Sequence, residues 1–327
     1  MLNTAQAGAA DPVHTVSAPD AAAMSRVVRR LMSAADKIDD IDWVDAARSA
    51  WEDLPAAYRR RIREFRRDPG PGGALIMRGL PVDEGTAGDT PMTAGSVQQT
   101  ATEVAALLVM TACGLGDPAA FLAEKSGALV QDVVPVPGQE QFQGNAGSVD
   151  LMMHNENAFH LHRPDFVMLL CLRPDHERRA GLSTACIREA LPLLSERTRE
   201  CLARPEFTTQ PPPSFGGGSE AVPQHAVLTG DPDDPDIRVD FAATAGLTEQ
   251  GRAALGELSA VLASVSRTVR MFSGDLAIVD NRLCLHGRTA FRPRYDGRDR
   301  WVQRTFAMTD LRRSRSYRTD DGHVLVR

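Results

Sequence analysis

Hydrophobic and polar positions divide the chain into a helical first third and a strand-rich remainder. Apolar residues recur at helical spacing from Ala21 to about Arg67, and the same spacing predicts a further helix from Gly95 to Cys113. Beyond residue 129 the apolar residues fall mostly into short β-prone runs separated by Pro, Gly and Asp. Helices followed by strands predict an α+β fold with a sandwich or barrel core, not alternating βαβ units. Strands are expected at 74–77, 130–136, 166–172, 237–241, 276–279 and 302–308, and further helices at 187–202 and after Thr248.

Two segments lack any periodic pattern. Residues 1–20 are small and polar, which predicts a disordered tail. Residues 206–235 contain three consecutive prolines and three consecutive glycines, so no regular element is expected there, and we interpret this loop as a lid. The remainder, 21–327, is predicted to form one domain, with a mainly helical part up to residue 128 and a strand-rich part from residue 129.

Composition narrows the function classes. With 37 Lys plus Arg against 43 Asp plus Glu, the formal net charge is −6, and no basic stripe interleaved with aromatic residues predicts a nucleic-acid partner. No apolar run is long enough to span a membrane and no secretion signal is recognisable, so a cytoplasmic protein is expected. The five cysteines are scattered and none lies in a CxxC pair, so neither disulfides nor a thiolate metal site is indicated. No heptad or exposed apolar stripe indicates the oligomeric state.

The sequence His154-Asn155-Glu156 follows a short, mostly apolar run. On a strand, side chains two residues apart point to the same face, so His154 and Glu156 are expected to present an imidazole and a carboxylate together. With His286, which follows a later strand-like run, they form the set of two histidines and one carboxylate that is typical of non-haem Fe(II) oxygenases. A zinc peptidase is not indicated, because HExxH requires the glutamate directly after the first histidine.

Two arginines follow His286 at intervals of 14 and 18 residues. Arg300 and Arg304 lie in a β-prone run and share a face if the run is a plain strand. A guanidinium fork near a metal is suited to bidentate binding of a small carboxylate.

Four motifs together resemble a known family. HNENAFH, GLSTA, GDLAIVDNRLCLHGRTAF and the trailing RxxxR look like the clavaminate synthase-like branch of Fe(II)/2-oxoglutarate oxygenases, whose members include clavaminate synthase and hydroxylases that act on free amino acids. The resemblance is densest from about residue 129 to 306, and it implies a double-stranded β-helix, or jelly roll, with helices outside. It implies that His154, Glu156 and His286 bind Fe(II), and that O2 and 2-oxoglutarate are consumed with release of succinate and CO2. A retained carboxylate at Glu156 argues against a halogenase.

The resemblance also assigns residues around the metal. Arg300 is expected to bind the C5 carboxylate of 2-oxoglutarate, and Thr184 to hydrogen-bond the same group. Arg304 and Glu124 are expected to bind the α-carboxylate and the α-amine of the substrate. Asp240 resembles an aspartate that faces the substrate's guanidinium or amide.

One departure from the family bears on the substrate. The arginine hydroxylases carry a second aspartate two residues before the position of Asp240, where this chain has Arg238. The prediction is therefore a basic free L-amino acid, with lysine, an arginine derivative and asparagine all left open. Hydroxylation is expected at C3, with C4 as the alternative, in antibiotic or other specialised metabolism.

Three alternative hypotheses for the function stay open. The enzyme could act on a carrier-bound or cyclised amino acid. The fold could be a jelly-roll metal protein without turnover. A zinc hydrolase could use His154, Glu156, His160 and His162.

Overall fold

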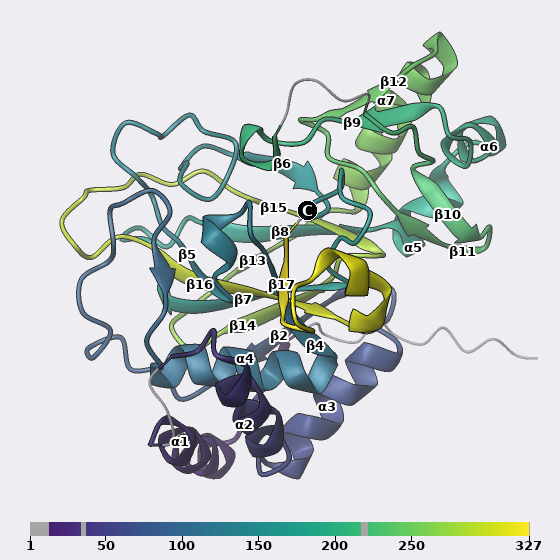
Figure 1. The fold of residues 1–327 in the computed structure, drawn as a ribbon. Coiled ribbons are helices and arrows are strands. Elements are labelled where there is room, and N and C mark those ends of the chain that lie inside the picture. The colour runs from purple at the N-terminus through teal and green to yellow at the C-terminus, as the bar shows by residue number, and fades with distance from the viewer. Residues whose placement is uncertain (1–12, 34–36, 217–221, 327) are drawn as a thin grey trace, which may run out of the picture.

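Two β-sheets facing each other form the centre of the computed structural model, which describes residues 13–33, 37–216 and 222–326. The arrangement is the double-stranded β-helix of an α+β fold, as predicted, and Figure 1 shows the helices outside it. The large sheet has the order β1-β2-β14-β7-β16-β4-β17, with β5 beside β16 and β3 beside β5. Its strands are β1 Val13–Thr15, β2 Ala74–Arg78, β3 Val97–Gln98, β4 Asp117–Phe121, β5 Val130–Val133, β7 Phe166–Arg173, β14 Leu276–Asp280, β16 Trp301–Met308 and β17 Val324–Leu325.

The smaller sheet lies against the inner face of the large one and carries most of the candidate ligands. Its order is β13-β8-β15-β6, so β6 is an edge strand. The four strands are β6 Leu151–His154, β8 Gly181–Cys186, β13 Arg267–Arg270 and β15 Cys284–Arg288. Apolar side chains from both sheets pack between them in one cluster that includes Ile76, Leu169 and Leu285.

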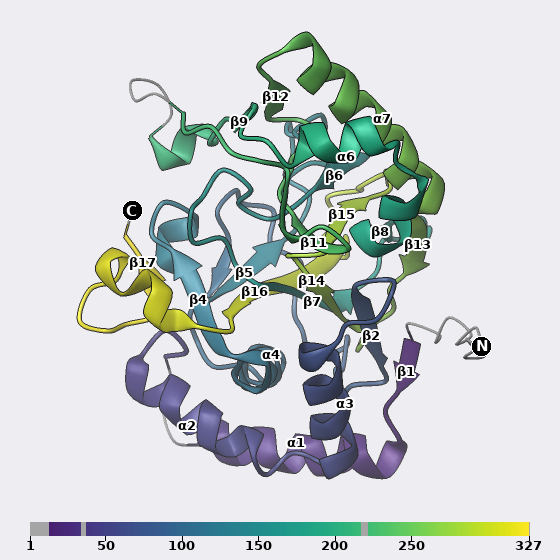
Figure 2. The same cartoon turned by 90° about the vertical axis from the view of Figure 1, so that its right-hand side faces the viewer.

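Helices cover the outer face of each sheet, as Figures 1 and 2 show. On the large sheet these are α1 Ala18–Met32, α2 Ile41–Trp51, α3 Ala56–Arg67 and α4 Glu103–Leu115. Beside the smaller sheet lie α5 Ile187–Ala190, α6 Glu196–Leu202 and α7 Glu249–Val265. Strand β7 is therefore buried on both faces, because Met168 and Leu170 pack toward the helices while Leu169 and Cys171 pack between the sheets. This explains the unbroken apolar run 166–172.

Several predicted boundaries are wrong for local reasons. The ordered chain begins before residue 20, since β1 pairs with β2 and the Ser17 side chain caps α1. The helix predicted from Gly95 starts only at Glu103, after the Thr102 cap, because residues 97–98 pair with β5. The helix predicted at 187–202 is divided by the short 3₁₀ helix η2 Leu191–Leu193, which contains Pro192.

The loop 206–235 contains more regular structure than its composition predicts. Strand β9 Phe207–Thr209 pairs with β12 Thr244–Gly246, and β10 Leu228–Asp231 forms a hairpin with β11 Asp234–Ile237. A 3₁₀ turn, η3 Pro213–Phe215, lies between them. These strands could not be predicted from composition. Strand β9 pairs with a remote strand, and β10 pairs with a strand that follows a tight Pro-Asp turn. The three-glycine run falls partly outside the described residues.

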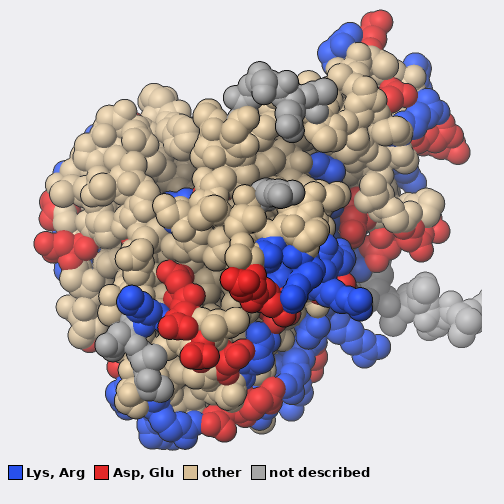
Figure 3. Space-filling model, viewed as in Figure 1, with Lys and Arg blue, Asp and Glu red and all other residues tan. Residues whose placement is uncertain are grey.

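Arginines gather along α3 and over the 3₁₀ segment η4 Leu311–Tyr317, with acidic residues beside them (Figure 3). In α3 the apolar residues Tyr58, Ile62 and Phe65 are buried, so the arginines form the solvated face, as predicted. Glu52 pairs with Arg59 at 2.6 Å and with Arg63 at 2.8 Å. The described cysteines form no disulfide. No helix in the described part of the chain is long and apolar enough to cross a membrane.

Candidate active site

The three predicted metal ligands meet at the edge of the smaller sheet. His286 on β15 lies opposite His154 on β6, and their ring centroids are 4.4 Å apart. Glu156 Oε2 lies 3.5 Å from His286 Nε2. One candidate ligand atom from each of the three residues lies within 4.8 Å of the others. Two imidazoles and a carboxylate therefore converge, as the sequence predicts.

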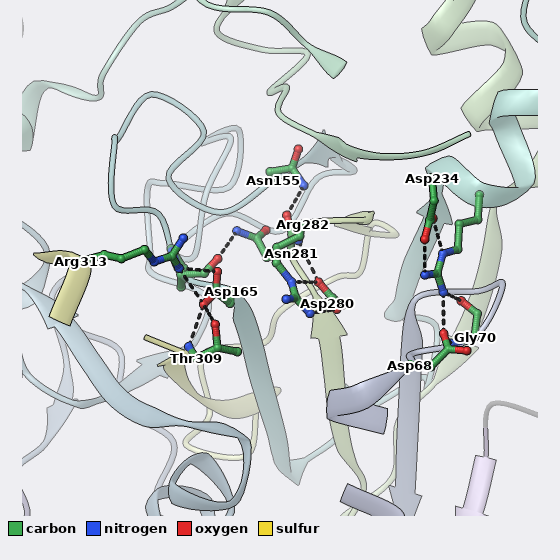
Figure 4. A network of polar contacts seen from close by, with 12 residues as sticks. Asp68, Gly70, Asn155, Asp165, Asp234, Asp280, Asn281, Arg282, Thr309 and Arg313 are labelled. Atoms are coloured by element: carbon green, nitrogen blue, oxygen red, sulfur yellow. Dashed lines mark hydrogen bonds and ion pairs between the residues drawn. The ribbon is translucent and has the colours of Figure 1, made fainter. Parts of the chain in front are cut away.

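Glu156 reaches this position from a turn, which corrects the expectation that it shares a strand with His154. Strand β6 ends at His154, and Asn157 has a positive φ of 51°. The side chain of Asn281 accepts a hydrogen bond from the Glu156 amide at 2.7 Å and donates to the Glu156 carbonyl at 3.0 Å. Asn155 in turn donates to the Asn281 carbonyl at 2.8 Å (Figure 4). Two buried asparagines, not a strand ladder, fix the carboxylate.

The same network continues beyond the ligand turn. Asn281 also donates to the carbonyl of Pro164 at 2.9 Å, so it spans both ends of the segment 156–164. Asp165, directly after this segment, accepts from the amide and hydroxyl of Thr309 and from Arg313 (Figure 4). The segment is thus anchored at its beginning and at its end.

The protonation states suit a divalent metal. His154 Nδ1 lies 2.9 Å from the Met152 carbonyl, which leaves Nε2 for the site. Burial, together with the neighbouring His154, lowers the pKa of His286, which keeps its imidazole neutral. Burial alone would raise the pKa of Glu156, but the Arg304 guanidinium and His286 hold it well below its usual range. Neutral imidazoles and an ionised carboxylate are the metal-binding forms.

Arg304 connects the ligand set to the predicted amino-acid site. Its Nη1 donates to Glu156 Oε1 at 2.7 Å, and its Nη2 donates to Glu124 and Gln131. Two atoms of this group are buried without a partner among the described residues, namely Arg304 Nε and Glu124 Oε2. An open donor and an open acceptor within one ion-paired group match the carboxylate and the ammonium of a free α-amino acid. Gln131 was not predicted, because nothing in its sequence context indicates that it meets Arg304.

Arg300 and Arg304 do not lie together on one regular strand, which was the condition for their sharing a face. It precedes β16, and the pairing of β16 with β7 shifts register between Trp301 and Val302. Its guanidinium carbon lies 5.8 Å from the centroid of the Phe291 ring, and that of Arg288 lies 5.4 Å from the same centroid. Burial and the charge of Arg300 lower the pKa of Arg288 to about 9. Sequence reasoning missed Arg288, since an arginine at a strand end is more often exposed.

Thr184 and Asp240 flank the ligands through backbone pairing. Thr184 is in register with His286 across β8 and β15, which places both side chains on the inward face. It lines a small cavity between the sheets with Ile76, Leu182 and Val269. Asp240 forms an isolated antiparallel bridge with His154, so it lies beside the first ligand although β11 already ends at Ile237.

Arg238 does not face the predicted substrate site. Its guanidinium donates to the carbonyl oxygens of Ala158, at 2.5 Å, and Phe159, at 2.9 Å. The arginine therefore holds the segment after Glu156, at the position where arginine hydroxylases have a second aspartate. Of the two positions 238 and 240, position 240 alone carries an acidic side chain, that of Asp240.

Aromatic rings connect the predicted lid to the ligand segment. Phe215 of η3 lies 4.7 Å from Phe159 between ring centroids and 6.0 Å from Phe121. His160 packs on Phe121 at 4.9 Å, and His162 packs on Tyr317 at 4.5 Å. The group of potential metal ligands that contains His154, Glu156 and His286 includes neither His160 nor His162. The zinc hydrolase hypothesis therefore loses its additional ligands.

Comparison with known proteins decides the family. Residues 72–306 match the family described as "Taurine catabolism dioxygenase TauD, TfdA family". The chain belongs to the TauD/TfdA family.

Two relatives and one solved structure place it within that family. The chain is 58% identical over 313 residues to the L-asparagine oxygenase of Streptomyces coelicolor, covering 95% of this chain and 94% of that protein. It is 32% identical over 272 residues to clavaminate synthase 2 of Streptomyces clavuligerus, covering 82% of this chain and 84% of that protein. A crystal structure of asparagine oxygenase in complex with Fe(II), 2S,3S-3-hydroxyasparagine and succinate matches with a TM-score of 0.94 and 57% identity, covering 97% of this chain and 100% of that chain.

This TauD/TfdA oxygenase is of the clavaminate synthase-like branch, as its motifs predict. It is an Fe(II)- and 2-oxoglutarate-dependent amino-acid hydroxylase, and the prediction of both cofactor and co-substrate is confirmed. The donor set fits the metal, because two histidines and one carboxylate with open positions select non-haem Fe(II). The non-catalytic jelly roll is thereby excluded.

Proposed function

We propose that this protein is an L-asparagine 3-hydroxylase that acts on the free amino acid. The observation that carries the proposal is the 58% identity to an L-asparagine oxygenase over 95% of the chain. The matching asparagine oxygenase structure is a complex with 3-hydroxyasparagine, which supports C3 as the carbon that is oxidised.

This proposal replaces the basic amino acid that the sequence alone favoured. That prediction depended on the acidic side chain of Asp240, which lies beside His154, while Arg238 is engaged with backbone carbonyls. A single carboxylate is a suitable acceptor for the side-chain amide of asparagine. It also repels the carboxylate of aspartate, which has nearly the same shape.

The site residues would have three separate roles: binding the metal, binding the amino acid and binding the co-substrate. His154, Glu156 and His286 would hold Fe(II), which with 2-oxoglutarate and O2 supplies the oxidising power for C–H hydroxylation. Arg304 Nε would bind the α-carboxylate and Glu124 Oε2 the α-ammonium, so that the β-carbon is directed at the metal. Arg300 and Thr184 would position 2-oxoglutarate, and the segment 206–235 would exclude water once the substrate is bound.

The direct test is a substrate panel measured as succinate formation with Fe(II), 2-oxoglutarate and O2. L-Asparagine is expected to give coupled turnover and a product one oxygen atom heavier, with the hydroxyl on C3 by NMR. Aspartate, glutamine, ornithine, lysine and arginine serve as comparators. Preferred turnover of a basic amino acid, or a hydroxyl on C4, would overturn the proposal. Preferred turnover of carrier-loaded asparagine would overturn its free-acid part.

The Asp240→Asn variant tests the amide contact. The variant keeps an oxygen for the Ala242 amide, which Asp240 Oδ1 binds at 2.8 Å, but it loses the negative charge. We expect kcat/KM for asparagine to fall about 10-fold, because a charge-assisted hydrogen bond becomes a neutral one. Turnover of aspartate, relative to asparagine, should rise. Asp233→Asn on the exposed β10–β11 turn is the matched control, and an unchanged ratio in Asp240→Asn would remove Asp240 from the specificity site.

A further inference from the structure

Arg288 is unusual among the buried arginines of this chain. Four arginines in the described ranges are buried, and three of them are paired with a carboxylate. Arg173 binds Glu84 at 3.2 Å, Arg304 binds Glu156 at 2.7 Å, and Arg318 binds Asp321 at 3.1 Å. Arg288, only 6% exposed, instead makes one hydrogen bond, from Nη2 to the Val149 carbonyl at 3.1 Å.

The Arg288 guanidinium also has an open donor. Its Nε is buried and has no partner among the described residues. Asp150 acts on Arg288 through its charge but forms no ion pair with it, so the buried guanidinium has no anion bonded directly to it among the described residues. An anion from outside the chain would satisfy the open donor and complete the ion pair.

The position of Arg288 indicates which anion. On β15 it follows the ligand His286 by two residues, and both residues keep their regular register against β8, opposite Leu182 and Thr184. Alternation therefore places Arg288 on the same inward face as the ligand, about 7 Å further along the strand. A five-carbon dicarboxylate held at one end by the triad spans that distance.

A second guanidinium lies beside it. Arg300 and Arg288 both have their guanidinium carbons within 5.8 Å of the Phe291 ring centroid. No carboxylate in the described ranges forms an ion pair with Arg300 either, although the charge of Asp175 acts on it. Two cations that share one aromatic neighbour and make no ion pair within the described chain form a pocket for a carboxylate.

We propose that Arg288 and Arg300 together hold the C5 carboxylate of 2-oxoglutarate, so that two guanidinium groups, not one, bind the distal end of the co-substrate. Arg288 is here a co-substrate-binding residue that supplies its Nε. The inference rests on the proposed function only through the co-substrate and is independent of which amino acid is hydroxylated.

The test compares Arg288→Met, Arg288→Lys and the control Arg292→Met, which changes an exposed arginine four residues away. Binding is measured without turnover, as the shift in Tm that 2-oxoglutarate produces with Mn(II) in place of iron. Arg288→Met should leave the Tm of the ligand-free protein unchanged or higher, since a buried unpaired charge is removed. Its 2-oxoglutarate-induced shift should shrink, and the lysine variant should be intermediate.

Steady-state kinetics provide the second readout. KM for 2-oxoglutarate should rise about 10- to 100-fold in Arg288→Met, as expected for a lost hydrogen bond to a charged group. KM for the amino acid should stay within about twofold. A lower Tm with an unchanged 2-oxoglutarate shift would show that Arg288 only supports Val149, and equal rises of both KM values would show general disruption. If Arg288→Met does not fold, an unchanged KM for 2-oxoglutarate in a destabilised Arg288→Lys would likewise overturn the proposal.

Binding in the absence of any amino acid separates this inference from the proposed function. A wrong substrate assignment would leave the Mn(II)–2-oxoglutarate Tm shift of the unmodified protein intact. A wrong assignment of Arg288 would leave asparagine turnover intact in the variants.

Discussion

Replacing Glu156 with glutamine is expected to abolish hydroxylation, with a loss of more than about 100-fold in kcat/KM. Changes to groups that merely support metal ligands cost 10- to 100-fold in affinity or activity, so loss of a ligand should exceed that range. The neutral amide is a poorer metal ligand, and it also removes the anion that Arg304 binds at 2.7 Å. Arg304 would then be left with one carboxylate, Glu124, for its buried charge.

The measurement for Glu156→Gln is Mn(II) affinity by electron paramagnetic resonance, together with succinate formation. The backbone contacts of residue 156 to Asn281 are unaffected by the substitution, so the turn should persist and circular dichroism should be unchanged. Glu249→Gln, on the exposed first turn of α7, is the control. Wild-type metal affinity in Glu156→Gln would show that this carboxylate is not a ligand.

Replacing Arg304 with methionine should have the second-largest effect. The guanidinium contacts Glu156, Glu124 and Gln131 and still has Nε open toward the amino-acid site. Its removal leaves the buried Glu156 and the partly buried Glu124 without their cation, and truncating one partner of such a group costs about 2–5 kcal/mol. We expect kcat/KM for asparagine to fall about 100- to 1000-fold.

Arg304→Met should also change the metal site, which separates it from a simple binding defect. With the guanidinium gone, the pKa of Glu156 should rise, because Arg304 is one of the groups that hold it low. Metal binding, followed by Mn(II) titration, should therefore weaken more steeply as the pH falls than in the unmodified enzyme. Arg304→Lys should restore little, because one ammonium cannot bridge both carboxylates and the substrate. An unchanged pH dependence of metal binding in Arg304→Met, alongside the exposed control Arg312→Met, would limit Arg304 to the amino acid.

The sequence located the ligands better than it described how they are held. His154, Glu156 and His286 could be predicted because four motifs occur in order, and the strands that carry both histidines have clear patterns. The turn at Glu156 could not be predicted from the sequence, because it depends on Asn281, which lies 125 residues away and meets it only in the folded chain. His154 and Glu156 do meet as predicted, but through the turn held by Asn281 and not through alternation along one strand.

Long-range pairing explains the other differences. Strand β9 is short and proline-flanked, and it becomes a strand because β12, more than 30 residues later, pairs with it. Arg288 gives no local signal of burial, which arises where loop 148–151 and Phe291 close over it. The preference for a basic substrate followed from the single acidic side chain of Asp240, and the engagement of Arg238 with two carbonyl oxygens is visible only in the folded chain.

The hydrogen bonds of Asn155 and Asn281 affect which part of the site can open locally. Strand β6 is an edge strand, and edges of sheets open locally more easily than their centres. The Glu156 amide, however, is bonded to a side chain at the end of β14, in the middle of the large sheet. Fraying of β6 can therefore expose the amides around Met152 to solvent exchange while the amide of Glu156 stays protected. The carboxylate ligand thus belongs dynamically to the slow-exchanging core, although along the chain it follows an edge strand.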